Sequence, residues 1–306
     1  MGLVSFLGIF ATNPGALPVG EKAGRPGRAA PQPGEAGQAA GGTRRQLREA
    51  GGNALLAADH LPNRIDVEDY CYLCEDMKKL IFWDLDGTLI DTLEDLGAAV
   101  NHALALRGLP LLGSEDFRKM VGRGVRNLVA QAVEKAAGRT DDAYIDSALA
   151  DFKEYYCAHI DTFTRPYPGM PELLAELSAA GVKMAVVSNK FQEGTERLVN
   201  EFFPGVAFVA ILGNRPGWPL KPSPEIVEDV LGRCEAADGG ISRADAILVG
   251  DSPTDMRTAS NGGIDAIAVT WGYSSPEELA AIVATDAPVG TRTAGSVAQL
   301  RRLLAE

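Results

Sequence analysis

The sequence predicts an α/β fold in which a doubly wound parallel sheet carries an inserted all-helical domain. Two observations predict it. From residue 79 onward, short apolar runs alternate with amphipathic helical segments, and one long interval within this pattern is helical throughout. The composition agrees, because 46% apolar and 23% charged residues are typical of a globular chain with a full core. A length of 306 residues suits one large domain or two of modest size.

The expected strands are short runs rich in valine, isoleucine and alanine. Their residues are apolar without alternation, which is typical of a parallel sheet buried on both faces. Such runs occur at residues 79–84, 182–187, 207–212, 246–250 and 266–270. The segments between them predict helices at residues 170–180, 193–203, 224–233 and 254–262. This alternation indicates right-handed βαβ units and a Rossmann-like sheet, which binds ligands beyond the carboxyl ends of its strands.

The interval from about residue 93 to residue 166 interrupts this alternation. It predicts no strand, and its expected helices are Leu93–Arg107, Ser114–Met120, Val125–Ala137 and Asp141–His159. A helical insert after the first strand would form a separate cap over the carboxyl ends of the sheet. We therefore expect an α/β core of residues 77–92 and 167–306 and a helical cap of residues 93–166.

Residues 1–76 differ in composition from the rest of the chain. Residues 1–50 are rich in glycine, alanine and proline, and such a segment buries too little apolar surface to offset its ordering entropy. We expect residues 1–76 to form a disordered extension, with a short helix within residues 51–76 as an alternative. No apolar run reaches the length of a membrane span, and we interpret the protein as cytoplasmic.

The first candidate site motif is Asp84-Leu85-Asp86-Gly87-Thr88, at the end of the first expected strand. Aspartate is depleted within strands. At a strand's carboxyl end, with Gly87 allowing a tight turn, the two carboxylates can converge on one point. One carboxylate can then attack phosphorus, and the other can protonate the leaving oxygen. An ordinary Asp-Gly turn is the structural alternative.

Two further segments carry residues suited to phosphate. Ser188 and Asn189 follow the apolar run Ala185–Val187, where a hydroxyl and nearby backbone N–H groups could bind phosphate oxygens. A plain Ser-Asn turn is the alternative. Lys221 precedes Pro222 and an expected helix, and its ammonium could neutralise charge on a phosphoryl group. A solvated lysine is the alternative there.

A fourth motif places two aspartates after the apolar run Ala246–Val249. Asp251 lies at the strand end and Asp255 lies one helical turn later. Oxygen ligands at such a point suit Mg²⁺, which takes one or two carboxylates together with waters and substrate phosphate. Asp255 also suits the first turn of a helix, where the helix dipole stabilises a negative charge.

In this order, each after a strand or loop of the sheet, the four motifs resemble those of the haloacid dehalogenase-like hydrolase superfamily over roughly residues 78–306. The resemblance implies a phosphatase that works through an aspartyl-phosphate, with Asp84 as nucleophile and Asp86 as general acid and base. It implies substrate binding by Thr88, Ser188, Asn189 and Lys221. It implies a Mg²⁺ site made by the Asp84 carboxylate, the Asp86 carbonyl and Asp251, with Asp255 supporting Lys221 or the metal shell.

The helical insert resembles the small cap of the subfamily that contains phosphoglycolate phosphatase and β-phosphoglucomutase. The segments similar to the phosphoglycolate phosphatase branch are Asp91-Thr92, Met120–Val125, Tyr167–Gly169 and Thr270–Tyr273. The resemblance implies 2-phosphoglycolate as substrate and glycolate as product. Arg123, between Gly122 and Gly124, could pair with the substrate carboxylate, and a solvated arginine is the alternative.

Other functions remain as alternatives to this substrate. A phosphatase of broader specificity would act on sugar phosphates, nucleotides or pyrophosphate. A non-catalytic scaffold would use residues 1–76 as a binding arm, although the intact acidic and lysine residues argue against lost catalysis. The net charge of −12 argues against nucleic acid, whose binding rests on cationic contacts with phosphates. We expect a small phosphorylated metabolite as partner, no membrane, and a monomer or homodimer.

Overall fold

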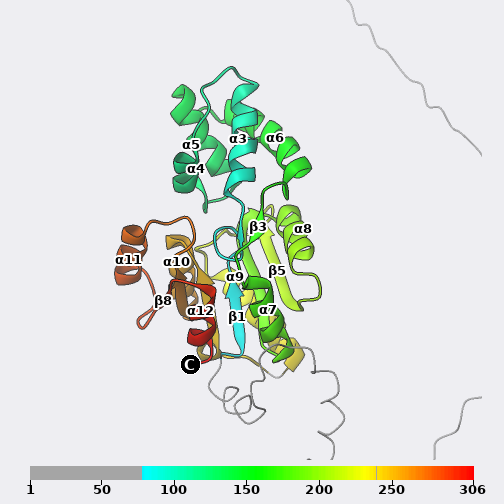
Figure 1. The fold of residues 1–306 in the computed structure, drawn as a ribbon, viewed down its shortest axis with the longest axis vertical. Coiled ribbons are helices and arrows are strands. Elements are labelled where there is room, and N and C mark those ends of the chain that lie inside the picture. The colour runs from blue at the N-terminus through cyan, green and yellow to red at the C-terminus, as the bar shows by residue number, and fades with distance from the viewer. Residues whose placement is uncertain (1–77, 239) are drawn as a thin grey trace, which may run out of the picture. The chain divides into compact units, whose positions relative to one another are not determined.

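The computed structural model describes residues 78–306 except residue 239, and for residues 235–238 it describes the backbone only. Its main feature is a six-stranded sheet in the order β5-β4-β1-β6-β7-β8, with every neighbouring pair parallel (Figure 1). The strands are β1 Leu80–Trp83, β4 Lys183–Phe191, β5 Phe208–Asn214, β6 Ala246–Gly250, β7 Asp265–Val269 and β8 Arg292–Ala294. The predicted extension of residues 1–76 lies outside the described residues.

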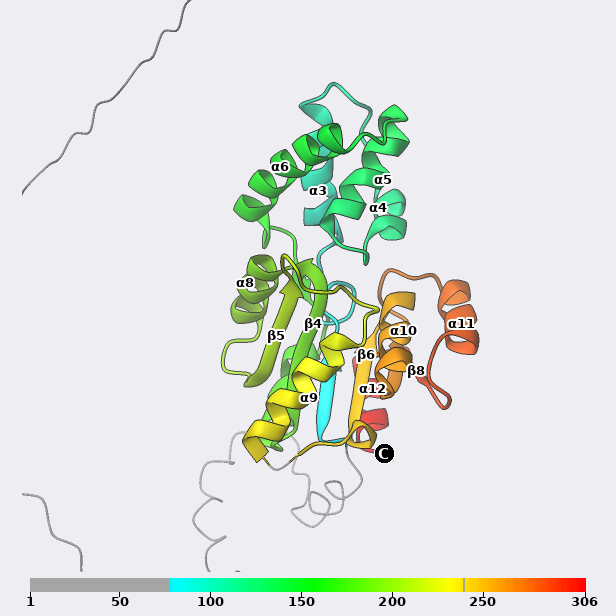
Figure 2. The same ribbon diagram turned by 180° about the vertical axis from the view of Figure 1, so that it is seen from behind.

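Helices cover both faces of this sheet (Figures 1 and 2). The helices α7, α8 and α12 pack on one face, and α9, α10 and α11 pack on the other. Successive side chains of β1 alternate between the two cores, because Ile81 and Trp83 join the first and Leu80 and Phe82 join the second. The helices are α7 Met170–Ala179, α8 Gln192–Phe202, α9 Glu225–Asp238, α10 Pro253–Gly262, α11 Pro276–Thr285 and α12 Val297–Leu304.

The predicted fold class is confirmed, and the predicted core elements are present with shifted ends. Among the strands the largest shift is in β4, which continues to Phe191 through a register irregularity after Val187. The predictions missed β8, a short strand with one buried side chain, because so polar a segment shows no apolar run. They also missed α11 and α12, although Ser275 and Ser296 are serine N-caps that signal a helix start.

The chain between β2 (Ile90–Asp91) and β3 (Arg165–Pro166) forms a group of helices. They are α3 Leu93–Ala105, α4 Ser114–Met120, α5 Val125–Ala137 and α6 Asp142–His159, close to the predicted ranges. The expectation of no strand in residues 93–166 is wrong at its last two residues. There β3 pairs with β2 in antiparallel orientation. A two-residue strand is too short to produce a periodic pattern, so the sequence could not reveal it.

The buried carboxylate of Asp95 joins the segment that enters the helical insert to the segment that leaves it, beside the β2–β3 ribbon. Asp95 lies in the first turn of α3 and accepts hydrogen bonds from the backbone N–H groups of Phe163 and Thr164 and from the Thr164 hydroxyl, at 2.7–3.1 Å. The start and the end of the helical insert are thereby held together. In the described part of the chain, no helix has the length and apolar character needed to cross a membrane.

Candidate active site

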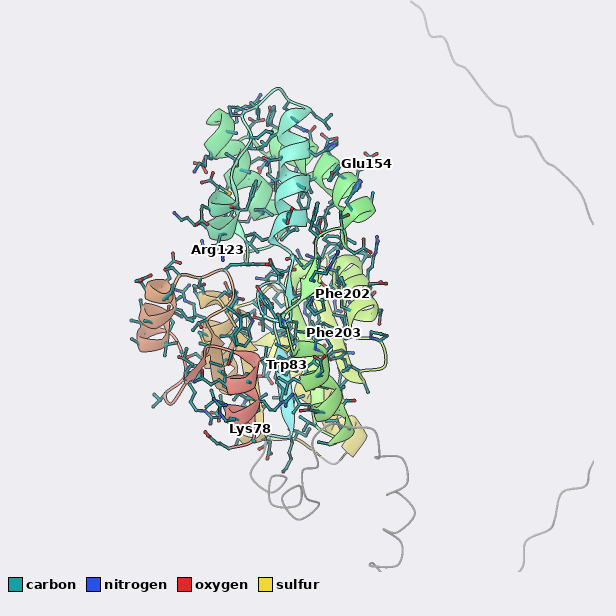
Figure 3. All side chains as sticks on the ribbon, viewed as in Figure 1. Lys78, Trp83, Arg123, Glu154, Phe202 and Phe203 are labelled. Atoms are coloured by element: carbon teal, nitrogen blue, oxygen red, sulfur yellow. The ribbon has the colours of Figure 1, made fainter. Side chains whose placement is uncertain are left out.

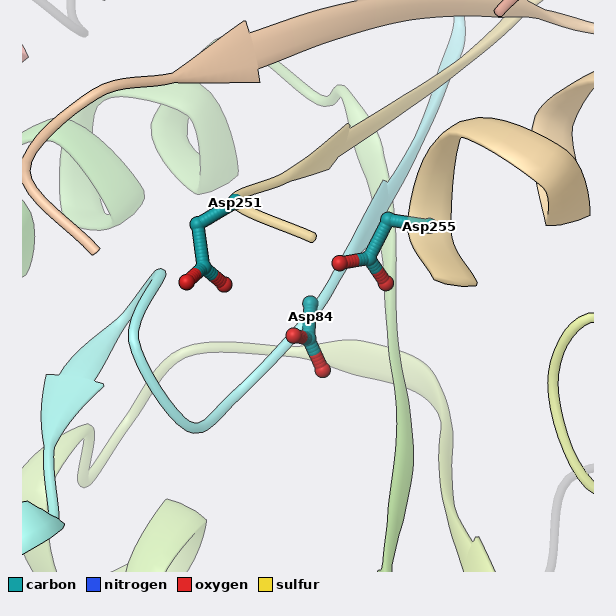
Figure 4. A group of neighbouring side chains, drawn as sticks. All are labelled: Asp84, Asp251 and Asp255. Atoms are coloured by element: carbon teal, nitrogen blue, oxygen red, sulfur yellow. The ribbon is translucent and has the colours of Figure 1, made fainter. Parts of the chain in front are cut away.

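Three aspartates converge at the carboxyl ends of β1 and β6 (Figure 4). Asp84 follows β1, Asp251 follows β6, and Asp255 lies in the first turn of α10. All three side chains are buried, and each offers an oxygen within 4.8 Å of the oxygens of the other two. The carboxylates of Asp84 and Asp251 are therefore close enough to share one ion.

Neighbouring donors fix two of these carboxylates. Thr88 Oγ1 donates to one oxygen of Asp251 at 3.1 Å, and the backbone N–H of Tyr273 donates to the other at 2.7 Å. Ser252 is the N-cap of α10, and its hydroxyl donates to Asp255 Oδ2 at 2.5 Å. The predicted role of Asp255 as a helix first-turn acid is therefore present in the structure.

Lys221 lies among these carboxylates and is 5% exposed, so the solvated-lysine alternative is excluded. Its Nζ donates to Asp84 Oδ1 at 2.7 Å and to Asp255 Oδ1 at 2.6 Å. Burial acts to lower the pKa of Lys221, but the charges of Asp255 and Asp84 outweigh it and hold the pKa above its ordinary value. Lys221 is therefore a permanent cation in this cluster.

The side chain of Asn189 holds the backbone around this lysine. Its Oδ1 accepts from the Lys221 N–H at 2.9 Å, and its Nδ2 donates to the Lys221 carbonyl at 3.1 Å. The same Nδ2 donates to the carbonyl of Gly122 in the helical insert at 3.0 Å. The amide of Asn189 is thus occupied by protein partners, and it positions the backbone of Lys221.

The three carboxylates carry more negative charge than the lysine can balance. When all three carboxylates are ionised, one ammonium leaves two negative charges, the amount that one divalent cation neutralises. Burial, with the nearby charge of Asp255, raises the pKa of Asp251 to about 7. Burial and the same neighbour also raise the pKa of Asp84. The donor set is all oxygen, so these residues fit Mg²⁺.

Asp86 points to a different set of partners. Thr92 Oγ1 donates to its Oδ1 at 2.8 Å, and Lys190 Nζ donates to its two oxygens at 3.0 and 3.2 Å. Ser188 is buried near them and accepts from the Lys190 backbone N–H at 3.2 Å. The Ser188 hydroxyl has no hydrogen-bond acceptor within the described part of the chain, so its own hydrogen remains available to a ligand.

A small cavity of about 30 Å³ lies between these residues and the helical insert. The sheet side supplies its polar residues, and the helical insert supplies only apolar residues and glycines. The residues from the sheet side are Asp84, Asp86, Ser188, Asn189, Lys190 and Lys221. Those from the insert are Leu96, Val121, Gly122, Gly124, Val125 and Leu128.

Comparison with known proteins gives a family for this arrangement. The model of the family described as haloacid dehalogenase-like hydrolase matches residues 81–269. The chain belongs to the haloacid dehalogenase-like hydrolases. A phosphoglycolate phosphatase of Mesorhizobium japonicum is 35% identical over 197 residues, which cover 64% of this chain and 85% of that protein. One of Caulobacter vibrioides is 34% identical, over 63% of this chain and 80% of that protein.

Solved structures of other proteins resemble this haloacid dehalogenase-like hydrolase. A crystal structure from Lactobacillus delbrueckii subsp. bulgaricus has a TM-score of 0.66 and 31% identity, covering 74% of this chain and 98% of that one. A predicted phosphoglycolate phosphatase from Haemophilus somnus 129PT has a TM-score of 0.66 and 26% identity, covering 74% and 97%.

Arg123 of this hydrolase is the predicted site residue that remains apart from the cluster. It is exposed, and it has no hydrogen-bond or ionic partner among the described residues (Figure 3). It lines a groove of about 350 Å³, whose other lining residues include Asp84, Asp86 and Asp251. The neighbouring Arg126, by contrast, is paired with Asp142 and Asp146 on the surface of the insert.

Three residues of the hydrolase site were not predicted from the sequence as site residues. Lys190 and Thr92 contact Asp86, and Tyr273 contacts Asp251 through its N–H and Thr92 through its hydroxyl. Lys190 follows Ser188 and Asn189 directly, so its position in that motif was the signal available. Tyr273 lies in the segment Thr270–Tyr273 that resembles the phosphoglycolate phosphatase branch, but that resemblance did not reveal its contact with Asp251, because only folding brings its loop beside β6.

Proposed function

We propose that this chain is a Mg²⁺-dependent phosphatase that hydrolyses a small phosphate monoester, 2-phosphoglycolate, to glycolate. The observation that carries the proposal is the buried group of Asp84, Asp251 and Asp255 around Lys221. Its uncompensated negative charge suits a divalent cation, and its lysine suits a phosphoryl group. The substrate is supported by relatives named phosphoglycolate phosphatase at 34–35% identity.

The proposed reaction has two steps at Asp84. In the first, a carboxylate oxygen of Asp84 attacks phosphorus, the ester P–O bond breaks, and Asp86 gives its proton to the leaving oxygen. In the second, Asp86 removes a proton from water, the resulting hydroxide attacks phosphorus, and inorganic phosphate leaves Asp84. Lys221 and the Ser188 hydroxyl bind the phosphoryl oxygens during both steps.

The metal would be held by the Asp84 carboxylate, the Asp86 carbonyl and Asp251. When bound, Mg²⁺ reduces the repulsion between an anionic nucleophile and an anionic phosphate. Thr88 positions Asp251 for this site, and Asn189 positions Lys221. Asp255 balances the charge of Lys221.

We also propose that residues 93–166 act as a cap domain on a core of residues 77–92 and 167–306. Two hydrogen bonds support this division, since Gly122 of the insert accepts from Asn189 and Arg118 donates to the Gly272 carbonyl at 3.1 Å. Arg197 of the core also donates to the Cys157 carbonyl and to the Asp161 carboxylate of the insert. A movement of the insert as a unit would break these contacts. The cavity of about 30 Å³ beneath the insert is narrow, and a movement of the insert would widen it.

Broader specificity is the second candidate. It is favoured by the groove of about 350 Å³ beside the acidic cluster, to which the helical insert contributes three cations, Arg118, Lys119 and Arg123. Such a groove suits a larger anion, as in sugar phosphates, nucleotides or pyrophosphate.

The activity is tested with para-nitrophenyl phosphate, with Mg²⁺ or with EDTA. Asp84→Asn should lower turnover by several orders of magnitude, because an amide is a poor nucleophile. EDTA should abolish the activity of the unmodified protein, and added Mg²⁺ should restore it. Asp146→Asn, an exposed substitution on the insert, is the matched control and should keep full activity. Full turnover by Asp84→Asn would contradict the proposal.

The substrate is tested separately with a panel of phosphate esters. We expect kcat/KM to be highest for 2-phosphoglycolate. A preference for sugar phosphates, nucleotides or pyrophosphate would replace this substrate with the second candidate and leave the phosphatase chemistry standing.

A further inference from the structure

Lys190 is a buried cation that the reaction described above does not use. Its side chain is 1% exposed, although lysine is rarely buried unless it is paired. Its ammonium lies 4.8 Å from the centre of the Tyr156 ring, which comes from α6 of the helical insert. Lys190 itself belongs to β4 of the sheet, so a movement of the insert would leave it in place.

The small cavity has only two cationic side chains among its lining residues, Lys221 and Lys190. Lys221 is taken by two carboxylates and lies where the phosphoryl group would bind. The helical insert lines the cavity with apolar groups and glycines only. If a substrate carries a second anionic group besides its phosphate, that group finds no charged partner on the side of the insert. A carboxylate brought into such a space needs a cation, since burying an unpaired charge is costly.

The chemistry of a phosphorylated 2-hydroxy acid requires that cation to lie beside Asp86. In such a molecule the leaving oxygen and the carboxylate are attached to the same carbon. The group that protonates the leaving oxygen and the group that binds the carboxylate must therefore be neighbours. Lys190 Nζ meets this requirement, because it lies 3.0 Å from the carboxylate of Asp86.

We propose that Lys190 is the residue that recognises the carboxylate of the substrate and makes the site selective for small phosphorylated 2-hydroxy acids. The proposal rests on the proposed function, and it assigns to Lys190 the role predicted for Arg123. An ammonium has three N–H donors, so Lys190 can bind the substrate carboxylate while it remains bonded to Asp86. Arg123 is exposed, where an ion pair contributes little, whereas Lys190 is shielded from water.

The test compares 2-phosphoglycolate with 2-hydroxyethyl phosphate, in which an uncharged hydroxymethyl group replaces the carboxylate and which is called the neutral ester below. Lys190→Met should lower kcat/KM for 2-phosphoglycolate roughly 100-fold more than for the neutral ester, because a buried charge pair is lost. Any effect that acts through Asp86 changes both substrates alike and cancels from this ratio. Lys190→Arg, which keeps the charge, should restore part of the preference. Arg123→Gln should leave the ratio near that of the unmodified protein.

If Lys190→Met alone is inactive or unfolded, the role of Lys190 is tested by a binding measurement instead. Asp86→Asn keeps the Lys190 ammonium without its carboxylate partner, whereas the double variant Asp86→Asn with Lys190→Met leaves no charge at this place. The two variants therefore differ only in the presence of the cation. Calorimetry should show that the double variant binds 2-phosphoglycolate roughly 100-fold more weakly than Asp86→Asn does, with little change for 2-hydroxyethyl phosphate.

The outcomes separate the two proposals. If the unmodified protein shows no preference for 2-phosphoglycolate over the neutral ester, the proposed substrate fails and the role of Lys190 fails with it. If the preference is present and persists in Lys190→Met, or if the double variant loses affinity for both ligands equally, the role of Lys190 alone is overturned. Loss of the preference in Arg123→Gln alone would assign the carboxylate to Arg123.

Discussion

At the scale of single residues, the site depends on close approach to Asp251. A Cβ atom on Gly87, which has a φ of +90°, would lie 2.6 Å from Asp251 Oδ2. A Cβ atom on Gly272 would also collide with the Asp251 side chain. Glycine at these two positions therefore gives the carboxylate room, and Thr88 and Tyr273 then fix its direction.

Gly87→Ala should weaken Mg²⁺ binding at least tenfold, because the new methyl group displaces the carboxylate of Asp251. The matched control is Gly205→Ala, since Gly205 has a φ of +88° and a Cβ there meets nothing within 4 Å. Both substitutions strain the backbone alike, and only the first touches the site. Titration of Mg²⁺ by calorimetry checks this. Equal Mg²⁺ affinity in the two variants would show that the contact is unimportant.

At the scale of elements, the helical insert is tied to the sheet by the β2–β3 ribbon and by one buried side chain. Asp95 accepts from the chain that leaves the insert, so α3 and the segment before β3 are fixed together. Truncation of this residue would leave buried N–H groups without partners. Each unpaired buried N–H group lowers the free energy of unfolding by more than an average hydrogen bond contributes.

Asp95→Ala should therefore lower the free energy of unfolding by on the order of 2–4 kcal/mol, measured by urea denaturation. Asp146→Ala is the control, because it removes an exposed aspartate of the same insert whose pair with Arg126 is open to solvent. That variant should unfold close to the midpoint of the unmodified protein. A similar midpoint for Asp95→Ala would mean that the ribbon alone holds the insert.

At the scale of the whole molecule, the stability of the protein is linked to pH and to the metal. Burial raises the pKa of Asp251 from its ordinary 3.8 to about 7. Between these values the metal-free folded protein holds a proton that the unfolded chain has released. Its stability should therefore fall as pH rises through this window, because the folded state binds more protons than the unfolded state.

Mg²⁺ binding requires the carboxylate form of Asp251, so the ion competes with this proton. We expect Mg²⁺ to raise the melting temperature more at about pH 8 than at about pH 6. Thermal unfolding with saturating Mg²⁺ and with EDTA checks this. The samples with EDTA, which hold no divalent cation, should be more stable at the lower pH. A Mg²⁺ effect that does not change with pH would be evidence against a titrating ligand.

The sequence determined which segments form the sheet and which residues end its strands. The apolar runs before Asp84 and Asp251 reveal buried strands, and a parallel sheet brings their carboxyl ends to one edge. Those local patterns were enough to predict the α/β class and the carboxylates at the strand ends, and the resemblance to the family added the lysine and the roles of the site residues. They could not predict β8 or the β2–β3 ribbon, since neither has a long enough apolar pattern.

Only the tertiary structure decided what each charged side chain contacts. Lys190 and Arg123 are both cations in site motifs, yet one is buried against Asp86 and the other faces solvent. Their difference depends on partners more than a hundred residues away for Lys190 and on the position of the insert for Arg123. Burial and charge pairing are properties of contacts across the fold, so a one-dimensional pattern cannot contain them.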